Sequence, residues 1–172
     1  MKTEVTLERL EEFTTALERG NVPYVVIAGF GLDGKRGLQT RPHQDLDVLC
    51  LKKDKDKVDT ILSSLRYAGP LMNDTYKLKR SDGSKIDLTF LTEEGDDLIS
   101  YGKTHITRFP RQMFSPQKAH IGTVSFSIAP NELLYVWGRD CPKGDDANYA
   151  KTLPIDEQIV SRISRQKQDH PL

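Results

Sequence analysis

Apolar residues recur along this chain at both helical and strand-like intervals, a pattern typical of a mixed α+β fold. Near the N-terminus, one apolar stripe with helical spacing is formed by Leu7, Leu10, Phe13 and Leu17. Thr6 can cap this helix, and Gly20 with Asn21 ends it. Two apolar runs, residues 24–27 and 46–51, predict buried strands, and the short connection between them does not favour a parallel pairing.

The segment after the second strand predicts a helix followed by a hairpin. Residues 58–67 carry apolar side chains at helical spacing, behind a charged turn at residues 52–57. An alternating stretch, residues 75–80, and an apolar strand, residues 85–91, flank the sequence Ser-Asp-Gly-Ser. Gly83 in that sequence suits a positive backbone φ, which is what a tight turn between two strands requires.

The last part of the chain is patterned less regularly. Residues 101–126 contain short strand-like pieces without a sustained period. Helices are expected over residues 131–137, over a short segment up to Leu153, and from Pro154 onward. A polar tail over residues 165–172 is expected to be frayed.

A chain of 172 residues is long enough for one good hydrophobic core with a small appendage. We expect a core domain over residues 1–100, completed by a C-terminal strand and helical part over residues 101–172. A single compact domain is the alternative.

The overall charge excludes some classes of partner. Lys plus Arg and Asp plus Glu each number 25, so the formal net charge is zero, and a general nucleic-acid binder would show a basic excess. No apolar run approaches membrane-spanning length and no signal-peptide core opens the chain, so we expect a cytoplasmic protein with no membrane partner. Cys50 and Cys141 are far apart and belong to no zinc or disulfide pattern.

Two carboxylates in the second strand are the first candidates for chemistry. Asp45 and Asp47 are separated by one residue, so both project from the same face of the strand, opposite to Leu46 and Val48. Two acids on one face repel each other unless a cation lies between them. Mg²⁺ is commonly held by one or two carboxylates together with water and substrate phosphates, so this spacing predicts a divalent metal site.

A third acid, Asp87, lies between Ile86 and Leu88 in the second strand of the hairpin. Burying an unpaired charge is costly, so its position calls for a reason. If this strand lies beside the strand of Asp45 and Asp47, three carboxylates converge on one side of a sheet. The alternative is a half-exposed strand on which Asp87 only faces solvent.

An acidic run follows the hairpin, at residues 92–97. One interpretation is a solvated loop or the start of a helix, where the helix dipole favours acids. The other is a wall of negative charge for a cationic substrate, to which Glu93, Glu94 and Asp96 would contribute.

Taken together, these motifs resemble a known family. The strings Ala-Gly-Phe-Gly-Leu-Asp (28–33), Thr-Arg-Pro-His-Gln-Asp-Leu-Asp-Val (40–48) and Ile-Asp-Leu (86–88) are similar to those of aminoglycoside 2''-adenylyltransferases and lincosamide nucleotidyltransferases. Both belong to the DNA-polymerase-β-like nucleotidyltransferase superfamily. The chain departs from the family pattern at Ala28, where a second glycine is usual, and at Gly144, which separates Lys143 from Asp145.

The resemblance implies an α+β fold with a mixed sheet flanked by helices and a small α-rich C-terminal part. It also implies roles for individual residues. Asp45 and Asp47 would bridge two Mg²⁺ ions, and Asp87 would hold the acceptor-side metal and act as general base. The residues that would bind the triphosphate are Gly29, Gly31, Thr40, Arg41 and His43. The segment carrying Lys143 would lie on the acceptor side.

The implied activity is Mg²⁺-dependent transfer of a nucleoside monophosphate, AMP from ATP or the equivalent from another triphosphate, to a hydroxyl of a small molecule, with release of pyrophosphate. An aminoglycoside or a lincosamide antibiotic is a candidate acceptor. The alternative is an antitoxin or other regulatory module of the same fold, which acts on a protein partner or without catalysis. The sequence does not reveal the oligomeric state.

Overall fold

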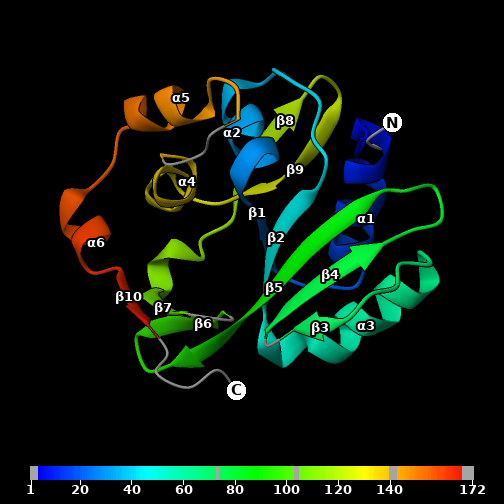
Figure 1. The fold of residues 1–172 in the computed structure, drawn as a ribbon, viewed down its shortest axis with the longest axis horizontal. Helices are drawn as coiled ribbons and strands as arrows, with labels where there is room; N and C mark the ends of the chain where they lie inside the picture. Colours follow the sequence, from blue (N-terminus) through cyan, green and yellow to red (C-terminus); the bar gives the residue numbers. More distant parts are fainter. Residues whose placement is uncertain (1–3, 73, 103–104, 140–142, 168–172) are drawn as a thin grey trace.

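The computed structural model describes residues 4–72, 74–102, 105–139 and 143–167, and it confirms the mixed α+β fold (Figure 1). Within these residues, ten strands form one hydrogen-bonded sheet. Eight of them follow the order β10-β7-β6-β5-β2-β1-β9-β8, and β4 pairs with both β5 and β3. No described helix combines the length and the apolar character that crossing a membrane requires.

The strands are β1 (Tyr24–Val26), β2 (Leu46–Leu51), β3 (Leu71–Met72), β4 (Thr75–Lys79), β5 (Lys85–Glu94), β6 (Asp97–Tyr101), β7 (His105–Pro110), β8 (Gln117–Ile121), β9 (Val124–Ile128) and β10 (Ser164–Lys167). The α-helices are α1 (Leu7–Arg19), α2 (Ala28–Arg36), α3 (Lys55–Ser64), α4 (Asn131–Gly138), α5 (Asp146–Thr152) and α6 (Glu157–Ser161). Short 3-10 turns occupy Lys52–Asp54 and Arg111–Met113.

The helices gather in two groups around the central strands. In Figure 1, α1 and α3 lie to the right of these strands, whereas α2, α4 and α5 lie above and to the left. The N-terminal helix begins as expected, because the Thr6 hydroxyl accepts a hydrogen bond from the Arg9 backbone N–H at 3.3 Å. Its buried face is formed by Leu10, Phe13, Thr14 and Leu17. This stripe packs toward β9 and α3.

Strand direction at the centre of the sheet brings the predicted motifs together. The two strands first predicted from the apolar runs, β1 and β2, pair antiparallel, whereas β2 and β5 pair parallel. The parallel register sets Asp47 beside Asp87. The strand of the third acid therefore does lie next to the strand of the first two.

The predicted hairpin is confirmed, and its turn has the expected chemistry. Strands β4 and β5 pair antiparallel, and Gly83 adopts a φ of 90°. The Asp82 carboxylate accepts hydrogen bonds from the backbone N–H and the hydroxyl of Ser84, at 2.9 and 2.7 Å. This local side-chain bond is a common device for stabilising a tight turn.

Helix α2 continues to Arg36, and Gly37 ends it in the left-handed conformation with a φ of 79°. Two local predictions are wrong, each for a tertiary reason. The acidic run is neither a loop nor a helix start, since residues 92–94 continue β5 by pairing with β6. Of the tail expected to be frayed over residues 165–172, residues 165–167 pair with β7 in strand β10, and residues 168–172 lie outside the described part of the chain.

The division at residue 100 stays a prediction, although the sheet crosses it. Strand β9, from the C-terminal part, pairs with β1 of the core through Val26 and Ile128. The expected α-rich C-terminal region corresponds to α4, α5 and α6.

Candidate active site

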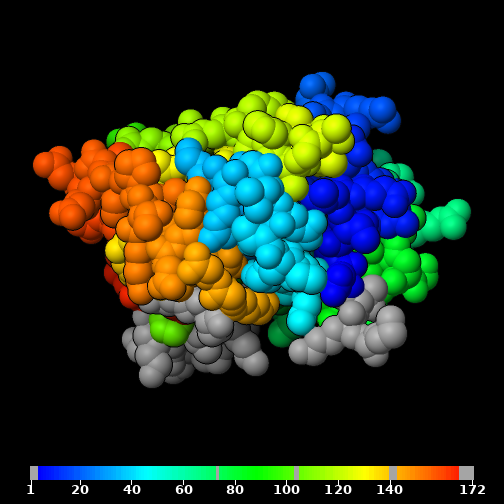
Figure 2. Space-filling model, turned by 90° about the horizontal axis from the view of Figure 1, so that it is seen from above, coloured from blue at the N-terminus to red at the C-terminus, as the bar shows by residue number. Residues whose placement is uncertain are grey.

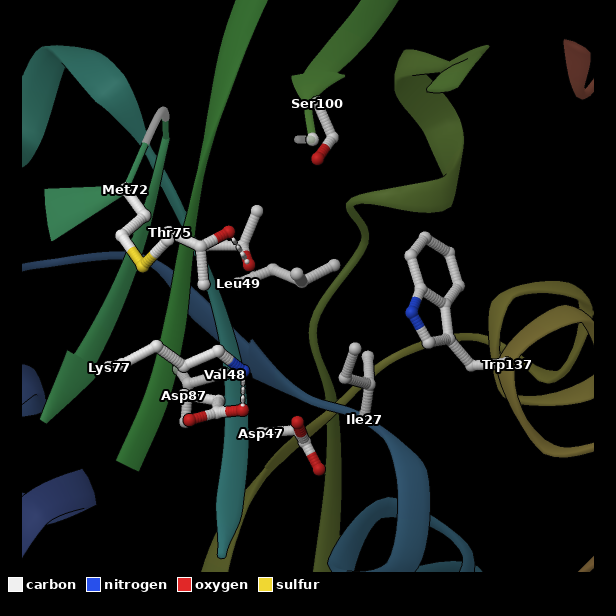
Figure 3. A pocket seen from close by; sticks show the side chains of 12 residues that line it. Ile27, Asp47, Val48, Leu49, Met72, Thr75, Lys77, Asp87, Ser100 and Trp137 are labelled. Atoms are coloured by element: carbon white, nitrogen blue, oxygen red, sulfur yellow. Dashed lines mark hydrogen bonds and ion pairs between the residues drawn. The ribbon is translucent and has the colours of Figure 1, made fainter. Parts of the chain in front are cut away.

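Three neighbouring strands place two acids and one lysine side by side. Asp47 on β2 pairs with Asp87 on β5, and Asp87 pairs in turn with Lys77 on β4. Paired residues on adjacent strands point to the same face, about 5 Å apart. The Lys77 ammonium forms an ion pair with the Asp87 carboxylate, as Figure 3 shows. Asp45 lies one residue before β2, on the Asp47 side of the strand.

The electrostatics of this row are dominated by negative charge. The pKa of the Asp47 carboxyl is raised to about 7, chiefly by burial and in addition by the charges of Asp45 and Asp87, whereas Lys77 and Lys143 act in the opposite direction. A carboxyl with such a pKa is destabilised in its ionised form. The fold therefore maintains an excess of negative charge here that the protein's own lysines do not fully compensate.

The carboxylates fit a hard divalent cation by their chemistry, because Mg²⁺ prefers carboxylate oxygens. Among the described residues no group of three or more His, Cys, Asp or Glu side chains already has metal-ligating spacing. The ion pair of Lys77 with Asp87 explains part of this lack of metal-ligating spacing, because it directs the Asp87 carboxylate toward an ammonium group. Asp45, Asp47 and Asp87 are the residues that would hold the ion.

A cavity of about 380 Å³ opens beside the row of charges (Figure 3). Its lining comes from β2, β3, β4, β5, the end of β6 and α4, and consists of Ile27, Asp47, Val48, Leu49, Met72, Thr75, Lys77, Asp87, Thr89, Ser100, Gly102 and Trp137. Asp47 and Asp87 lie at one end, and Trp137 faces the strands from the opposite wall. A cavity of this size can hold a small-molecule ligand next to the carboxylates.

The glycine turn at the start of α2 is shaped by close packing. A Cβ atom on Gly29 would collide with the His43 ring, and one on Gly31 would lie 2.9 Å from the Val26 carbonyl oxygen. The Gly31 N–H already donates a hydrogen bond to the Ile27 carbonyl at 3.2 Å. The role of Gly31 is therefore to leave room for the Val26 carbonyl, not to offer an N–H group to a ligand. The first turn of a helix leaves N–H groups without intrahelical partners, and that turn is where Gly29 lies.

Ala28 begins this turn with a φ of 53°, in the left-handed region that glycine adopts more readily. We expect Ala28→Gly to raise the free energy of unfolding by up to about 1 kcal/mol, because the left-handed conformation costs an alanine about 1–2 kcal/mol and the added chain entropy of glycine offsets only part of that. Urea denaturation measures the change. Ala16→Gly, in the interior of α1, is the control and should lower the free energy of unfolding by about 1 kcal/mol. If Ala28→Gly also lowered the free energy of unfolding, Ala28 would not be strained in its left-handed conformation.

A buried carboxylate, Asp33, organises the loop between α2 and β2. It is fully buried and accepts hydrogen bonds from the Thr40 hydroxyl at 2.6 Å and the Thr40 backbone N–H at 3.1 Å. Its other partners are His43 Nε2 at 2.6 Å and Arg36 Nη1 at 3.4 Å, and the His43 ring packs on Phe30 with centroids 4.2 Å apart. Burial alone would raise the pKa of Asp33, but the hydrogen bonds from His43 and Thr40 outweigh burial, so the pKa is lowered. Thr40 and His43 are thus held by an acid inside the fold.

A second buried carboxylate, Asp146, binds the two arginines of the same region. Arg41 Nη2 and Nε lie 2.6 and 3.2 Å from its Oδ2 atom, and Arg36 Nη1 lies 3.3 Å from Oδ1. The Arg36 guanidinium also lies over the Tyr149 ring at 4.0 Å. Figure 2 shows α5 in orange against α2 in cyan. Gly144, with a φ of 59°, lies against the Arg41 side chain, where a Cβ would be 3.2 Å from Cδ.

The predicted acceptor-side acids do not line the cavity. Glu93 is paired with Lys53 and Arg111, and Glu94 is paired with Arg108. Asp96 is exposed in the turn between β5 and β6, where its carbonyl accepts the Arg111 N–H at 2.9 Å. Lys143 is exposed, and its charge acts on Asp47 at the metal end of the site.

Three residues of this region, Lys77, Asp33 and Asp146, were missed from the sequence. Counting from the hairpin turn would have found Lys77, since the register across the turn sets it opposite Asp87. Trp137, in the helix expected over residues 131–137, packs edge-on against Phe109 and also lines the cavity. Asp33 and Asp146 carry no local signal that separates them from surface acids.

Comparison with known proteins agrees with this geometry. A sequence profile described as Aminoglycoside-2''-adenylyltransferase matches residues 9–126, more than half of the chain. No curated protein sequence matches the chain. The fold is similar to that of the lincosamide antibiotic adenylyltransferase LnuA with lincomycin bound, at a TM-score of 0.69 and 20% identity over 87% of this chain and 99% of that one.

It is also similar to ANT(2'')-Ia in complex with adenylyl-2''-tobramycin, at a TM-score of 0.62 and 14% identity over 85% of this chain and 87% of that one. At these identities the structural likeness concerns the fold, which is that of a nucleotidyltransferase. The sequence profile, which matches more than half of the chain, identifies the family. The chain therefore belongs to the aminoglycoside-2''-adenylyltransferase family of nucleotidyltransferase enzymes.

Proposed function

We propose that the protein transfers AMP from ATP to a hydroxyl group of a small molecule and releases pyrophosphate. The observation that carries this proposal is the row of Asp47 and Asp87 on adjacent parallel strands, next to Asp45 and open to a cavity. Clustered acids destabilise the folded protein unless they bind a cation, and nucleotidyl transfer needs cations beside phosphates. Family membership supports the same reaction.

On the nucleotide side, the chain supplies positive charge and free N–H groups. Arg41, held by Asp146, would bind phosphate oxygens together with the N–H groups at the turn of Gly29. Lys143, whose charge acts to lower the pKa of the Asp47 carboxyl, would add positive charge to the same site. Thr40 and His43 are both engaged by Asp33, and we assign them the task of holding the loop that presents Arg41.

On the acceptor side, Asp87 would accept the proton of the attacking hydroxyl, since its carboxylate faces the cavity. Lys77 would orient this carboxylate through their ion pair. Two Mg²⁺ ions bound by the three acids would supply charge neutralisation for the phosphates and for the attacking and leaving oxygens.

A transfer assay tests this function. With Mg²⁺, ATP and a panel of hydroxyl-bearing antibiotics and metabolites, the protein should release pyrophosphate only when an acceptor is present. Asp87→Asn should lower kcat by at least about a hundredfold, because general-base catalysis contributes about 10² to 10⁴. Pyrophosphate release is measured by a coupled enzymatic assay, and the adenylylated product by mass spectrometry.

The control is Asp56→Asn, which removes an exposed acid on α3, away from the cavity lining. This variant should keep the kcat of the original protein. Full turnover by Asp87→Asn, or acceptor-independent release of pyrophosphate, would contradict the proposed role.

The Asp146 contacts lead to a separate prediction about the nucleotide. We expect Asp146→Asn to raise the KM for ATP by about tenfold, because the amide cannot hold both arginines as a carboxylate does, while kcat changes less. Steady-state kinetics at saturating acceptor separates the two parameters.

Asp145→Asn is the matched control for this substitution. The neighbouring Asp145 side chain is 73% exposed and lies 3.8 Å from the Arg36 guanidinium. The KM of Asp145→Asn for ATP should stay within about twofold of the value for the original protein, because exposed ion pairs contribute little. Equal effects of the two substitutions would show that net charge, and not the buried contact, determines nucleotide binding.

A further inference from the structure

The cavity floor is divided into a charged row and a neutral row of side chains. Asp47, Asp87 and Lys77 form the charged row across β2, β5 and β4. Two residues further along the same strands, the paired positions are Leu49, Thr89 and Thr75, and Met72 of β3 pairs with Thr75. Side chains on one face of a strand repeat every second residue, so these rows are adjacent on the same surface.

The neutral row has no carboxylate to offer a ligand. The Thr75 and Thr89 hydroxyls are hydrogen-bonded to each other at 2.9 Å. Leu49 and Met72 contribute apolar surface, and the opposite wall is formed by the Trp137 indole and the Ser100 hydroxyl (Figure 3). Beyond the reacting carboxylates, the described lining is therefore apolar with a few hydroxyl groups.

Four acids outside the cavity lining have cationic partners in the protein. Glu93 and Glu94 are paired with arginine or lysine side chains, and Asp97 is paired with Arg108 at 3.3 Å. Asp74, next to the cavity residue Thr75, is bound through Oδ1 by Lys52 at 2.8 Å, and its buried Oδ2 atom has no hydrogen-bond partner among the described residues. No carboxylate in the described lining is available besides Asp47 and Asp87.

This distribution disfavours an acceptor with several positive charges. Each ammonium group that enters a cavity loses hydration and needs a carboxylate or another acceptor in return. The two carboxylates present are required by the reaction, and the Lys77 ammonium would repel a nearby cation. An apolar ligand surface against Trp137, by contrast, gains from burial and from contact with the indole ring.

We infer that the acceptor is an amphipathic molecule with at most one positive charge, whose apolar part lies between Trp137 and the neutral row while its hydroxyl reaches Asp87. This inference rests on the proposed function, since it identifies the class of acceptor for the same site. It differs from the expectation that an acidic wall recognises a polycation.

Trp137 provides a direct test, because it is the only tryptophan of the chain and lines the cavity. Its fluorescence is titrated, without nucleotide, with lincomycin, an amphipathic molecule with a single basic amine, and with tobramycin, which carries several amines. Lincomycin should change the emission and bind at least about tenfold more tightly than tobramycin, a difference of about 1.4 kcal/mol. Tighter binding of tobramycin, or no response to either compound at millimolar concentration, would overturn the inference.

A charge variant tests the cause of the preference. Met72 is 48% exposed at the cavity rim, so Met72→Glu introduces a carboxylate into the neutral row without disturbing the core. The ratio of lincomycin to tobramycin affinity should fall at least about fivefold, because Coulomb attraction now favours the polycation. Leu38→Glu is the control, since Leu38 is 55% exposed and outside the cavity lining, and should leave the ratio unchanged. An unchanged ratio in Met72→Glu would contradict the neutral row as the source of selectivity.

The binding test and the transfer assay can contradict the acceptor class and the proposed reaction separately. Lincomycin binding detected by Trp137 without any pyrophosphate release would leave the acceptor class standing and contradict the proposed reaction. Transfer of AMP to tobramycin in preference to lincomycin would support the reaction and contradict the acceptor class.

Discussion

Asp47→Asn is expected to lower AMP transfer by at least about a thousandfold and, at the same time, to make the metal-free protein more stable. The loss of activity follows from removing the central carboxylate of the site that would bind metal ions and phosphates. The gain in stability follows from removing a charge that is partly buried beside Asp45 and Asp87. Repulsion between acids at such short range can reach about 1–3 kcal/mol.

The sign of the pH dependence follows from the raised pKa. In the unfolded chain Asp47 releases its proton near its ordinary value of 3.8, whereas in the folded protein it keeps the proton up to about 7. Between these values the folded state binds more protons, so this group makes the protein less stable as the pH rises. The stabilisation by Asp47→Asn should therefore be largest above pH 7 and vanish below pH 4.

Thermal denaturation in EDTA at pH 5 and pH 8 measures this difference. The variant should have the higher Tm at pH 8 and a smaller advantage at pH 5. Added Mg²⁺ should raise the Tm of the original protein and leave that of Asp47→Asn nearly unchanged, because ligand binding stabilises the state that binds it. Asp56→Asn again serves as the exposed-acid control. A variant less stable than the original at pH 8 would contradict the excess of negative charge.

Asp33→Ala is expected to destabilise the protein by about 3–5 kcal/mol, the usual cost of removing one partner from a buried charged network. Asp33 accepts bonds from Thr40 and His43, and Arg36 lies 3.4 Å from its Oδ1 atom. Without the carboxylate the buried His43 ring and the other donors lose their acceptor, and the loop leading to Arg41 loses its anchor. Turnover should fall with stability.

The pH dependence of this contribution has the opposite sign to that of Asp47. The pKa of Asp33 is lowered, since the hydrogen bonds outweigh burial. Its stabilisation is therefore fully present above the ordinary carboxyl pKa of 3.8 and is lost as the pH falls through the lower folded value. Urea denaturation at pH 7 and acid titration at low pH measure both effects. Asp33→Asn, which keeps the shape of the side chain, should not show this sensitivity to acid. A decrease of less than about 1 kcal/mol in the free energy of unfolding of Asp33→Ala would contradict the role of the network.

Features that depend on neighbouring residues were predictable. The spacing of Asp45 and Asp47 places them on one strand face in any sheet, because strand periodicity is a property of the backbone. The hairpin turn was predicted from Asp82 and Gly83, which form it through a local hydrogen bond and a positive φ. The first helix was predicted from its cap and its apolar stripe for the same reason.

Features that depend on pairing between segments far apart in the sequence could not be predicted from local patterns. Strand β5 extends through the acidic run because β6 pairs with it, although Glu93 and Glu94 resemble loop residues locally. Strand β10 forms because β7 offers an edge. Glu93, Glu94 and Asp97 have arginine or lysine partners from other elements, which no local pattern shows.

By itself, the sequence determined the strand that carries Asp45 and Asp47, the glycine turn before α2 and the hairpin that carries Asp87, since each depends on backbone periodicity or on turn chemistry within a few residues. Tertiary structure decided which acid serves which purpose. Parallel pairing of β2 with β5 set Asp87 beside Asp47, whereas packing of α2 and α5 buried Asp33 and Asp146. A carboxylate is chemically the same in all these places, and only its burial and its partners, which come from far along the chain, distinguish the proposed metal ligands from the acids that support the site.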